Sequence, residues 1–290
     1  MEKVTVDAET SIELQENTSC NIIRLIKGTS GHVFASSSLY IHDKNANLNI
    51  LFDTSFPYNS KNLLDALKKL EIEPDQINYI ILSHWHFDHC GSINFFKNAT
   101  IIMSYETYRS IDYFDQAIKY SLSQEKPIDS LTNILFQKMN DHKRKAEFEP
   151  TINDNYKYFD NYSKVRAIAN IIINNNNMYS QIIDKVNQGK FLIIENKTKN
   201  LSSNLILYNL NLHTEGDLIL EIQNKNFSSF CVGDILEDNN SESYDSLIKD
   251  RFISDNDNQL IKHIFKPGNI IIKGHGNDCF INEMKRICNI

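Results

Sequence analysis

The sequence predicts a mixed α/β protein, and three patterns carry this prediction. Short apolar runs rich in Ile, Leu and Val alternate with turns rich in Gly, Asn and Asp, which is typical of strands. An amphipathic pattern of leucines near the start of the chain is typical of a helix. Over about 105–190, Tyr and Phe are frequent and helical spacing dominates, so we expect a mostly helical insertion there.

The expected strands alternate with helices in the first third of the chain and return after the insertion. The strands are expected at 21–26, 33–41, 48–52, 77–82, 191–195, 205–210, 218–222, 227–232 and 269–272. A helix is expected after Ser60, because leucines repeat at helical spacing and the pattern stops before Pro74. Further helices are expected at about 244–253, at 257–265 and from Asn277.

Composition narrows the classes of partner. A net charge of −7 argues against a broad basic surface for nucleic acid. The N-terminus is mixed and acidic, and polar residues interrupt every apolar run, so we expect no secretory signal and no membrane span. Five cysteines without a Cys-x-x-Cys spacing fit a reducing cytosol. We therefore expect a cytoplasmic protein with a small-molecule substrate, and the oligomeric state stays open, a homodimer included.

One short segment carries the chemistry. Three histidines and an aspartate fall within the six residues His84-Trp85-His86-Phe87-Asp88-His89, directly after the strand expected at 77–82. Burying so many polar groups is costly unless each is paired, and a metal is the simplest partner. An irregular loop can direct His84 and His86 at one ion, and Asp88 and His89 at a second. The alternative is a solvated polar loop.

This segment resembles the second motif of the metallo-β-lactamase superfamily. Four further segments resemble the family's other motifs in the right order: Leu51-Phe52-Asp53-Thr54, His213-Thr214-Glu215-Gly216-Asp217, Val232-Gly233-Asp234 and Lys273-Gly274-His275-Gly276. The resemblance covers about 20–280 apart from the insertion. It implies an αββα sandwich, in which two mixed sheets pack face to face with helices outside, and a single domain over 1–290 with the helical insertion at about 105–190.

The resemblance also implies a set of metal ligands. His84, His86 and His213 would hold one ion, whereas Asp88, His89 and His275 would hold a second. Asp234 would bridge the two ions, and Asp53 would accept hydrogen bonds that hold the ligand loop. Imidazole and carboxylate without thiolate suit two zinc ions most readily, and Fe or Mn also fit. Taken singly, His213 and His275 also fit capping or surface histidines, and both Asp53 and Asp234 fit strand-ending turns.

The activity that the resemblance implies is hydrolysis. A metal-bridging hydroxide would cleave a small ester, lactone, thioester or amide, with Asp88 orienting the water or shuttling its proton. Asp234 stands where true β-lactamases generally have Cys or Ser, so antibiotic hydrolysis is not implied. Glu237 stands where quorum-quenching lactonases carry Tyr, which weakens the case for a lactone. Leu212 and Lys273 replace a Gly and a Pro common in the family, which alters loop shape more than ligation.

Three other functions remain open at this point. The same two-metal site supports phosphodiester hydrolysis, for which Lys273 is a candidate phosphate contact. Some superfamily members hold a single iron and oxidise persulfides. A non-catalytic sensor that retains the metals is a further alternative, although the complete ligand set argues against it.

Aromatic residues and a cysteine near the motif have plainer interpretations. Packing is favoured over substrate contact for Trp85 and Phe87, and over metal binding for Cys90. In the insertion, aromatic residues at helical spacing are expected mainly in the core, and a lid over an apolar substrate pocket is the alternative. These aromatic residues include Tyr105, Tyr108, Tyr113, Phe114 and Tyr120.

Overall fold

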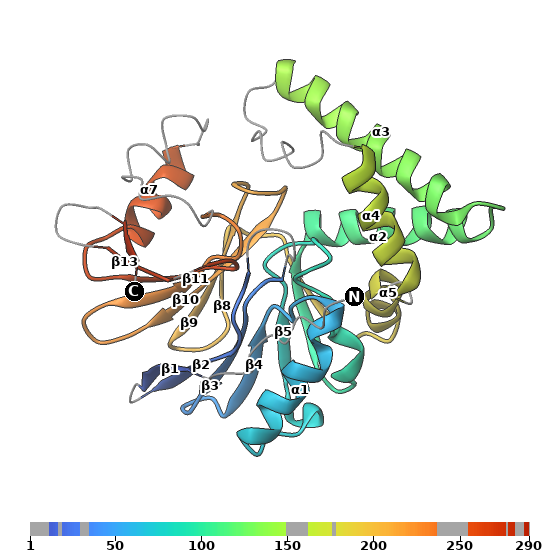
Figure 1. Ribbon diagram of the computed structural model, residues 1–290. Helices are drawn as coiled ribbons and strands as arrows, with labels where there is room; N and C mark the ends of the chain where they lie inside the picture. Colours follow the sequence, from blue (N-terminus) through green and yellow to red (C-terminus); the bar gives the residue numbers. More distant parts are fainter. Residues whose placement is uncertain are drawn as a thin grey trace.

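The apolar runs form two seven-stranded sheets in the computed structural model of the chain. The structure describes residues 12–16, 19–29, 35–148, 162–175, 178–236, 255–276, 278–281 and 287–289. Figure 1 shows the two sheets packed face to face, with helices on their outer sides. The αββα architecture with a helical insertion, expected from the sequence, is confirmed.

The first sheet follows chain order from β1 to β7. Its strands are β1 (Ile12–Glu16), β2 (Cys20–Ile26), β3 (Ser38–Asp43), β4 (Leu48–Phe52), β5 (Tyr79–Ile81), β6 (Thr100–Ser104) and β7 (Phe191–Ile194). Strands β1 to β4 pair antiparallel, and β4 to β7 pair parallel. The C-terminal ends of β4 and β5 therefore meet at one edge of the sheet.

The second sheet has the order β14-β13-β12-β11-β10-β9-β8. Its strands are β8 (Thr198–Asn200), β9 (Leu205–Leu210), β10 (Asp217–Gln223), β11 (Ser228–Cys231), β12 (Ile270–Ile272), β13 (Cys279–Ile281) and β14 (Ile287–Asn289). All neighbours pair antiparallel except β11 and β12, which are parallel. The ends of β9, β11 and β12 consequently point to the same edge.

Helices cover both outer faces. They are α1 (Ser60–Lys69), α2 (Tyr105–Leu122), α3 (Pro127–Phe148), α4 (Tyr162–Asn174), α5 (Met178–Asn187) and α7 (Asp255–Ile264), with short 3₁₀ turns at Pro57–Asn59, Pro74–Gln76 and Ile93–Phe95. Helix α3 packs on α2 and α4 packs on α3, whereas α1, α2 and α5 bury apolar residues against the first sheet. Helix α7 does the same on the second sheet. Burial of these stripes holds the outer layers in place.

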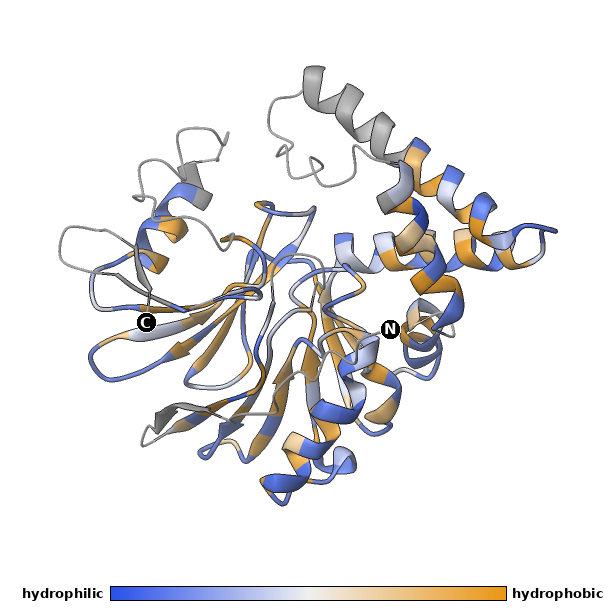
Figure 2. Cartoon of the chain, viewed as in Figure 1, coloured by the Kyte–Doolittle hydropathy of each residue, from blue (hydrophilic) through white to orange (hydrophobic). Residues whose placement is uncertain are grey.

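Aliphatic side chains from both sheets fill the space between them. Ile41, Ile50, Ile81, Leu207 and Leu220 are buried together in this inner cluster. Figure 2 shows apolar residues concentrated along the strands, whereas hydrophilic residues gather on the outer surfaces of the helices. The two sheets are therefore joined chiefly by non-directional apolar contact.

Several local expectations were wrong or incomplete. The helix expected from Asn277 is wrong, because the described residues there form β13 and β14, which extend the second sheet beyond β12. Pairing with an existing sheet overrides local helix propensity in this segment. The strand expected at 33–41 begins at Ser38 in the structure. Strands β1, β6 and β8 were not expected. The helix expected at about 244–253 lies outside the described residues.

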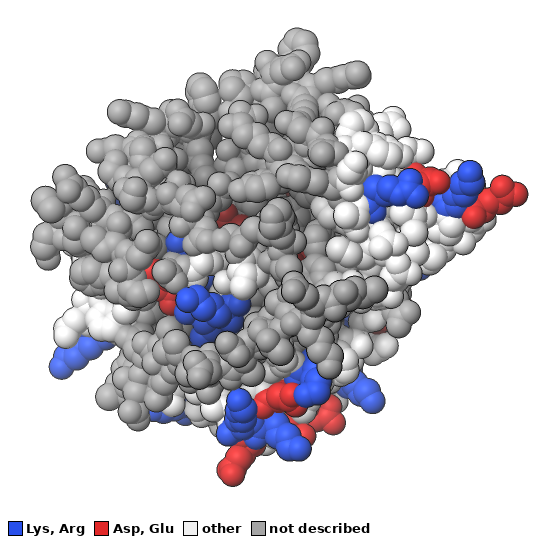
Figure 3. Space-filling model, viewed as in Figure 1, with Lys and Arg blue, Asp and Glu red and all other residues white. Residues whose placement is uncertain are grey.

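The surface is mixed in charge. Within the described part of the chain, no helix is long and apolar enough to cross a membrane. Figure 3 shows lysines and arginines next to acidic residues at the lower and right-hand edges of the face in view.

A buried lysine ties α5 to the segment that follows the histidine motif. Lys185 is 7% exposed, and its Nζ donates to the backbone oxygens of Phe96, Lys97 and Ala99 at 2.7, 3.2 and 3.2 Å. These carbonyls follow the 3₁₀ turn at Ile93–Phe95, and those of Phe96 and Lys97 also accept from Ala99 N and Lys190 Nζ.

We predict that Lys185→Met lowers the free energy of unfolding by about 1–3 kcal/mol, because three backbone carbonyls lose a buried donor. Urea unfolding followed by circular dichroism measures the change. Lys190→Met is the matched control, since Lys190 Nζ also donates to Lys97 O but from an exposed position. Equal losses in the two variants would contradict the prediction.

Candidate metal centre

The structure brings together all seven side chains that the sequence predicted as metal ligands. They are His84, His86, Asp88, His89, His213, Asp234 and His275. They follow the C-terminal ends of β5, β9, β11 and β12, at the edge where the two sheets meet. A hydrogen bond from Leu218 N to Ser83 O, at 2.7 Å, joins the sheets directly beside the cluster.

Four of these residues form a first group. The Nε2 atoms of His84 and His213 lie 2.8 and 3.2 Å from Nδ1 of His86. Oδ2 of Asp234 lies 3.9 Å from Nε2 of His84 and 3.8 Å from Nε2 of His213. One donor atom from each of the four residues thus lies within 4.8 Å of the others, a spacing that can hold one metal ion.

The other three residues form a second group next to the first. Oδ2 of Asp88 lies 3.8 Å from Nε2 of His89 and 3.2 Å from Nε2 of His275. Oδ2 of Asp234 is as close to this group, at 3.3 Å from His89 Nε2 and 3.2 Å from His275 Nε2. Asp234 therefore stands between the two groups and faces both.

The donor atoms fit a cation better than they fit one another. Nε2 of His89 and Oδ1 of Asp234 are buried and have no hydrogen-bond partner among the described residues. Each neutral imidazole carries a single N–H, so the converging nitrogens of the first group leave lone pairs without donors. A divalent cation satisfies such lone pairs and a buried carboxylate together.

Asp53 holds the histidine loop from behind, as expected. Its carboxylate accepts from Ser83 N and Ser83 Oγ, both at 2.8 Å, and lies 2.8 Å from His89 Nδ1. Ser83 Oγ also lies 2.9 Å from His84 Nδ1. Burial raises the pKa of Asp53, and the neighbouring His89 and Ser83 only partly offset this effect. The far nitrogens of His84 and His89 are thereby held toward the cluster.

Tight backbone geometry places the ligands. Asp53 has φ 57°, a left-handed conformation that is uncommon for a residue with a side chain and is found at functional sites. A Cβ on Gly274 would lie 2.2 Å from Oδ1 of Asp234. A Cβ on Gly233, which has φ +55°, would lie 2.7 Å from the Cβ of Ser83. The glycines beside Asp234 and His275 thus permit close approach of the β11 and β12 loops.

Asp217 is a functional residue that the sequence interpretation did not single out. Its Oδ2 accepts from Leu212 N at 2.8 Å and from His213 N at 2.7 Å, and its Oδ1 accepts from Thr214 N at 2.9 Å. Asp217 ends the motif His213-Thr214-Glu215-Gly216-Asp217. An acidic residue at the end of this turn was the sequence feature from which its role could have been predicted. Leu212, which replaces the usual glycine, is buried and leaves this turn intact.

The other histidine loop is anchored by the end of β2. Nδ1 of His275 donates to the backbone oxygen of Thr29 at 2.9 Å, so its Nε2 faces the cluster. In the first histidine loop, Ser36 Oγ donates to the backbone oxygen of Asp88 at 2.8 Å. Segments near residues 29 and 36 therefore position ligands that lie far away in sequence.

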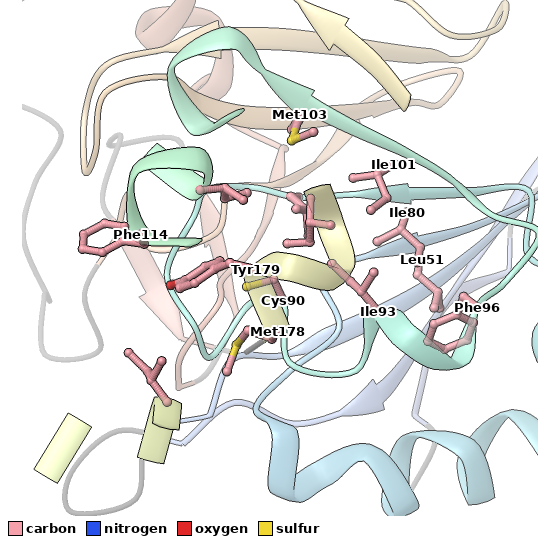
Figure 4. Close-up of a cluster of buried hydrophobic side chains, with 14 of the residues drawn as sticks. Leu51, Ile80, Cys90, Ile93, Phe96, Ile101, Met103, Phe114, Met178 and Tyr179 are labelled. Atoms are coloured by element: carbon pink, nitrogen blue, oxygen red, sulfur yellow. The ribbon is translucent and has the colours of Figure 1, made fainter. Parts of the chain in front are cut away.

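The aromatic residues of the motif pack as favoured from the sequence. Trp85 stacks on Phe114 of α2, with ring centroids 4.5 Å apart, and Phe87 meets Phe56 edge-on at 5.4 Å. The hydroxyl of Tyr179 on α5 donates to the backbone oxygen of Trp85 at 3.1 Å. Figure 4 shows Tyr179 next to Cys90 within a cluster of buried hydrophobic side chains. The insertion thus packs against the back of the histidine loop.

Insertion residues are divided between core and surface. Phe114 is buried, whereas Tyr105, Tyr113 and Tyr120 are exposed. Core packing therefore accounts for only part of the aromatic content of the insertion.

The remaining sequence candidates lie outside the cluster. Cys90 is buried, its Sγ donates to His86 O at 3.4 Å, and burial raises the pKa of its thiol well above the usual range, so packing fits it best. Lys273 is 2% exposed and cannot present its ammonium to solvent. Glu237 lies outside the described residues.

The two groups differ in protonation in the metal-free chain. Burial lowers the pKa of His84 well below its usual range and that of His86 to about 3, so both are neutral near pH 7. Burial also disfavours charge on His275, but the carboxylates of Asp234 and Asp88 outweigh it and raise the pKa of His275 to about 10. The pKa of His89 is raised in the same way, well above its usual range.

Sequence comparison finds a match to one family model. A model described as Metallo-beta-lactamase superfamily matches residues 31–156. Metallo-beta-lactamase domain-containing protein 1 from Xenopus laevis is 35% identical over 63 residues, which are 22% of this chain and 27% of that protein. An N-acyl homoserine lactonase from Bacillus cereus is 35% identical over 57 residues, 20% of this chain and 23% of that protein. The matches span about a quarter of these curated relatives.

Structural comparison agrees on the fold. The chain is similar to AidC, a dizinc quorum-quenching lactonase solved in complex with a product, N-hexnoyl-L-homoserine. The TM-score is 0.55 at 15% sequence identity, and the match covers 96% of each chain. At this identity the likeness shows the metallo-β-lactamase fold.

We predict that Asp217→Ala lowers the free energy of unfolding by about 1–3 kcal/mol and speeds amide hydrogen exchange in the 211–216 turn, because buried amides lose their acceptor. Denaturant unfolding and exchange followed by mass spectrometry measure the two effects. Thr214→Val is the control, since it removes only the hydroxyl that donates to Asp217 Oδ1 at 2.6 Å. Unchanged exchange in the turn of Asp217→Ala would show that Asp217 does not hold His213.

Proposed function

We propose that this metallo-β-lactamase superfamily domain is a dinuclear metal-dependent hydrolase of small esters, lactones, thioesters or amides. One observation carries the proposal: Oδ2 of Asp234 lies within 3.9 Å of imidazole nitrogens in both histidine groups. A carboxylate so placed is suited to bridge two cations. His84, His86 and His213 then hold one ion, and Asp88, His89 and His275 hold the other.

The donor set limits the metals and the chemistry. Imidazole and carboxylate ligands suit two zinc ions, and they also accept Fe or Mn. When bound, a pair of divalent cations lowers the pKa of water to supply a nucleophile and polarises the scissile carbonyl.

Residues of the chain supply the proton transfers and the shielding from water. Burial raises the pKa of Asp88, but His89 and His275 outweigh it, so the pKa is lowered and the carboxylate stays ionised. An ionised Asp88 at the cluster can orient the attacking water and accept its proton. Trp85 and Phe87 are half-buried on either side of His86 and line the motif with apolar surface.

Two findings bear on the substrate. The curated matches include N-acyl homoserine lactonases, which supports testing lactones first. The acidic chain favours a neutral or apolar substrate over nucleic acid. The buried side chain of Lys273 removes the candidate phosphate contact, so phosphodiester hydrolysis has less support than carbonyl chemistry.

Metal analysis separates this proposal from the iron-dependent alternative. Protein purified without added metal is analysed for elements and then assayed with esters, lactones, thioesters and phosphodiesters. Two metal equivalents per chain with hydrolytic turnover support the proposal. One iron per chain with oxygen consumption on persulfides would instead assign the mononuclear dioxygenase.

A cytoplasmic location and a single domain stay predictions of the sequence, and the oligomeric state stays open.

We predict that His86→Ala and Asp234→Ala each lower kcat/KM by more than about 100-fold, because even an outer partner of a metal ligand is worth 10–100-fold. Initial rates on the best substrate of the panel measure the loss. His42→Ala is the matched control, since His42 on β3 contacts Asn49 at 2.9 Å, away from the cluster. Full activity in Asp234→Ala would refute the mechanism.

We predict that uptake of the second metal ion strengthens with pH more steeply than uptake of the first. The first group includes His84 and His86, which are already neutral, whereas His275, with a pKa of about 10, must lose a proton to bind. Below that pKa, each competing proton makes the apparent affinity rise about tenfold per pH unit. Zinc titrations against a chelator from pH 6.5 to 8.5 measure both steps, and a flat second step would contradict the protonation of His275.

A further inference from the structure

A charged residue is buried at the inner face of β2, where its neighbours are apolar. Arg24 is 5% exposed and shares the burial alternation of Cys20 and Ile22, which face the space between the sheets. Its guanidinium pairs with the carboxylate of Asp278, which is 3% exposed and belongs to the loop before β13. This ion pair therefore joins the first sheet to the second through a directional contact.

The ion pair lies next to a proposed metal ligand in sequence and in space. Asp278 follows His275 by three residues, and the Nδ1 of His275 is bound to Thr29 O, five residues after Arg24. Just before His275, Ser37 N donates to Gly274 O at 2.6 Å, and a Cβ on Gly28 would lie 1.9 Å from that same oxygen. Arg24 and Gly28 thus contact the chain on both sides of His275, at Asp278 and at Gly274.

We propose that Arg24 and Asp278 are positioning residues for His275, which set the loop so that its imidazole completes the second metal site. This inference rests on the proposed dinuclear function. The Thr29 carbonyl fixes the direction of the imidazole ring, and the bond from Ser37 N holds the backbone of Gly274, the residue before His275. The Arg24–Asp278 pair holds the chain three residues after His275.

The contribution of the ion pair to positioning is separable from its contribution to stability. Replacing a buried ion pair by apolar residues of similar volume is often neutral or stabilising, whereas removing one partner leaves an uncompensated buried charge. Arg24 Nε and Asp278 Oδ1 have no hydrogen-bond partner among the described residues, so desolvation of this pair is only partly compensated. We therefore expect the apolar double variant to fold well.

The test compares metal uptake by the wild-type chain, the double variant Arg24→Met with Asp278→Leu, and the single variant Arg24→Met. Metal-free protein is titrated with zinc against a chromogenic chelator, and thermal unfolding is recorded in parallel. In the double variant we expect the first equivalent to bind as in wild type, the second to bind at least about tenfold more weakly, and the Tm to be unchanged or higher. The single variant loses both Tm and second-site affinity.

A control separates loop positioning from general destabilisation. Glu221 is buried on the outer face of the second sheet, where it accepts from Tyr208 and Ser228, both at 2.6 Å. Glu221→Leu therefore lowers the Tm while leaving both equivalents bound as in wild type. If the double variant fails to fold, Arg24→Lys decides, because it keeps the charge but loses the planar fork. A weaker second equivalent in Arg24→Lys supports the proposal, and an unchanged one overturns it.

Failure of this inference can be told apart from failure of the proposed function. A wild-type chain that binds fewer than two equivalents refutes the dinuclear hydrolase and this inference together. A wild-type chain that binds two equivalents, alongside a folded double variant that binds both with unchanged affinity, overturns only the role of Arg24 and Asp278.

Discussion

The arrangement of the site depends on the cost of burying polar atoms that face one another. Oδ2 of Asp234 lies against both histidine groups, while Nε2 of His89 and Oδ1 of Asp234 have no hydrogen-bond partner among the described residues. Such a cluster gains from folding only if something compensates the lost hydration. A bound cation provides this compensation. The need to hold the imidazole nitrogens toward a cation also explains why so many hydrogen bonds of the surrounding chain are made to a few imidazole rings.

Three of these rings are held by a contact at the ring nitrogen that faces away from the cluster. Asp53 contacts His89, Ser83 contacts His84, and the Thr29 carbonyl contacts His275, each at a ring Nδ1. The supporting residues come from the first sheet or its loops, whereas His275 belongs to the second. The site is therefore complete only when both sheets are correctly placed relative to each other, which the Leu218 N to Ser83 O bond helps to secure.

The predictable part of the site was the part with local order in the sequence. The cluster from His84 to His89 and the strand directly before it follow from spacing alone, and the family resemblance added His213, Asp234 and His275. The roles of Asp217 and Arg24 were not predicted. Asp217 accepts from backbone amides, and Arg24 pairs with Asp278, 254 residues away, and neither contact produces a periodic pattern in the sequence. The helix expected from Asn277 failed for a related reason, since pairing with β12 decided that segment.

Apolar packing and directional contacts have different tasks in this fold. Burial of aliphatic side chains between the sheets, such as Ile81, supplies most of the free energy that holds the sheets together. Such apolar contacts are not directional, so they tolerate small movements of one sheet along the other. A metal site tolerates much less, because ligands must be held to within about 0.5 Å of the productive geometry. A buried ion pair across the sheets adds little stability because desolvation of its charges is costly, yet it favours one relative position of its two partners. The Arg24–Asp278 pair lies between β2 and the chain that follows His275, where the relative position of the two sheets decides whether His275 reaches the site.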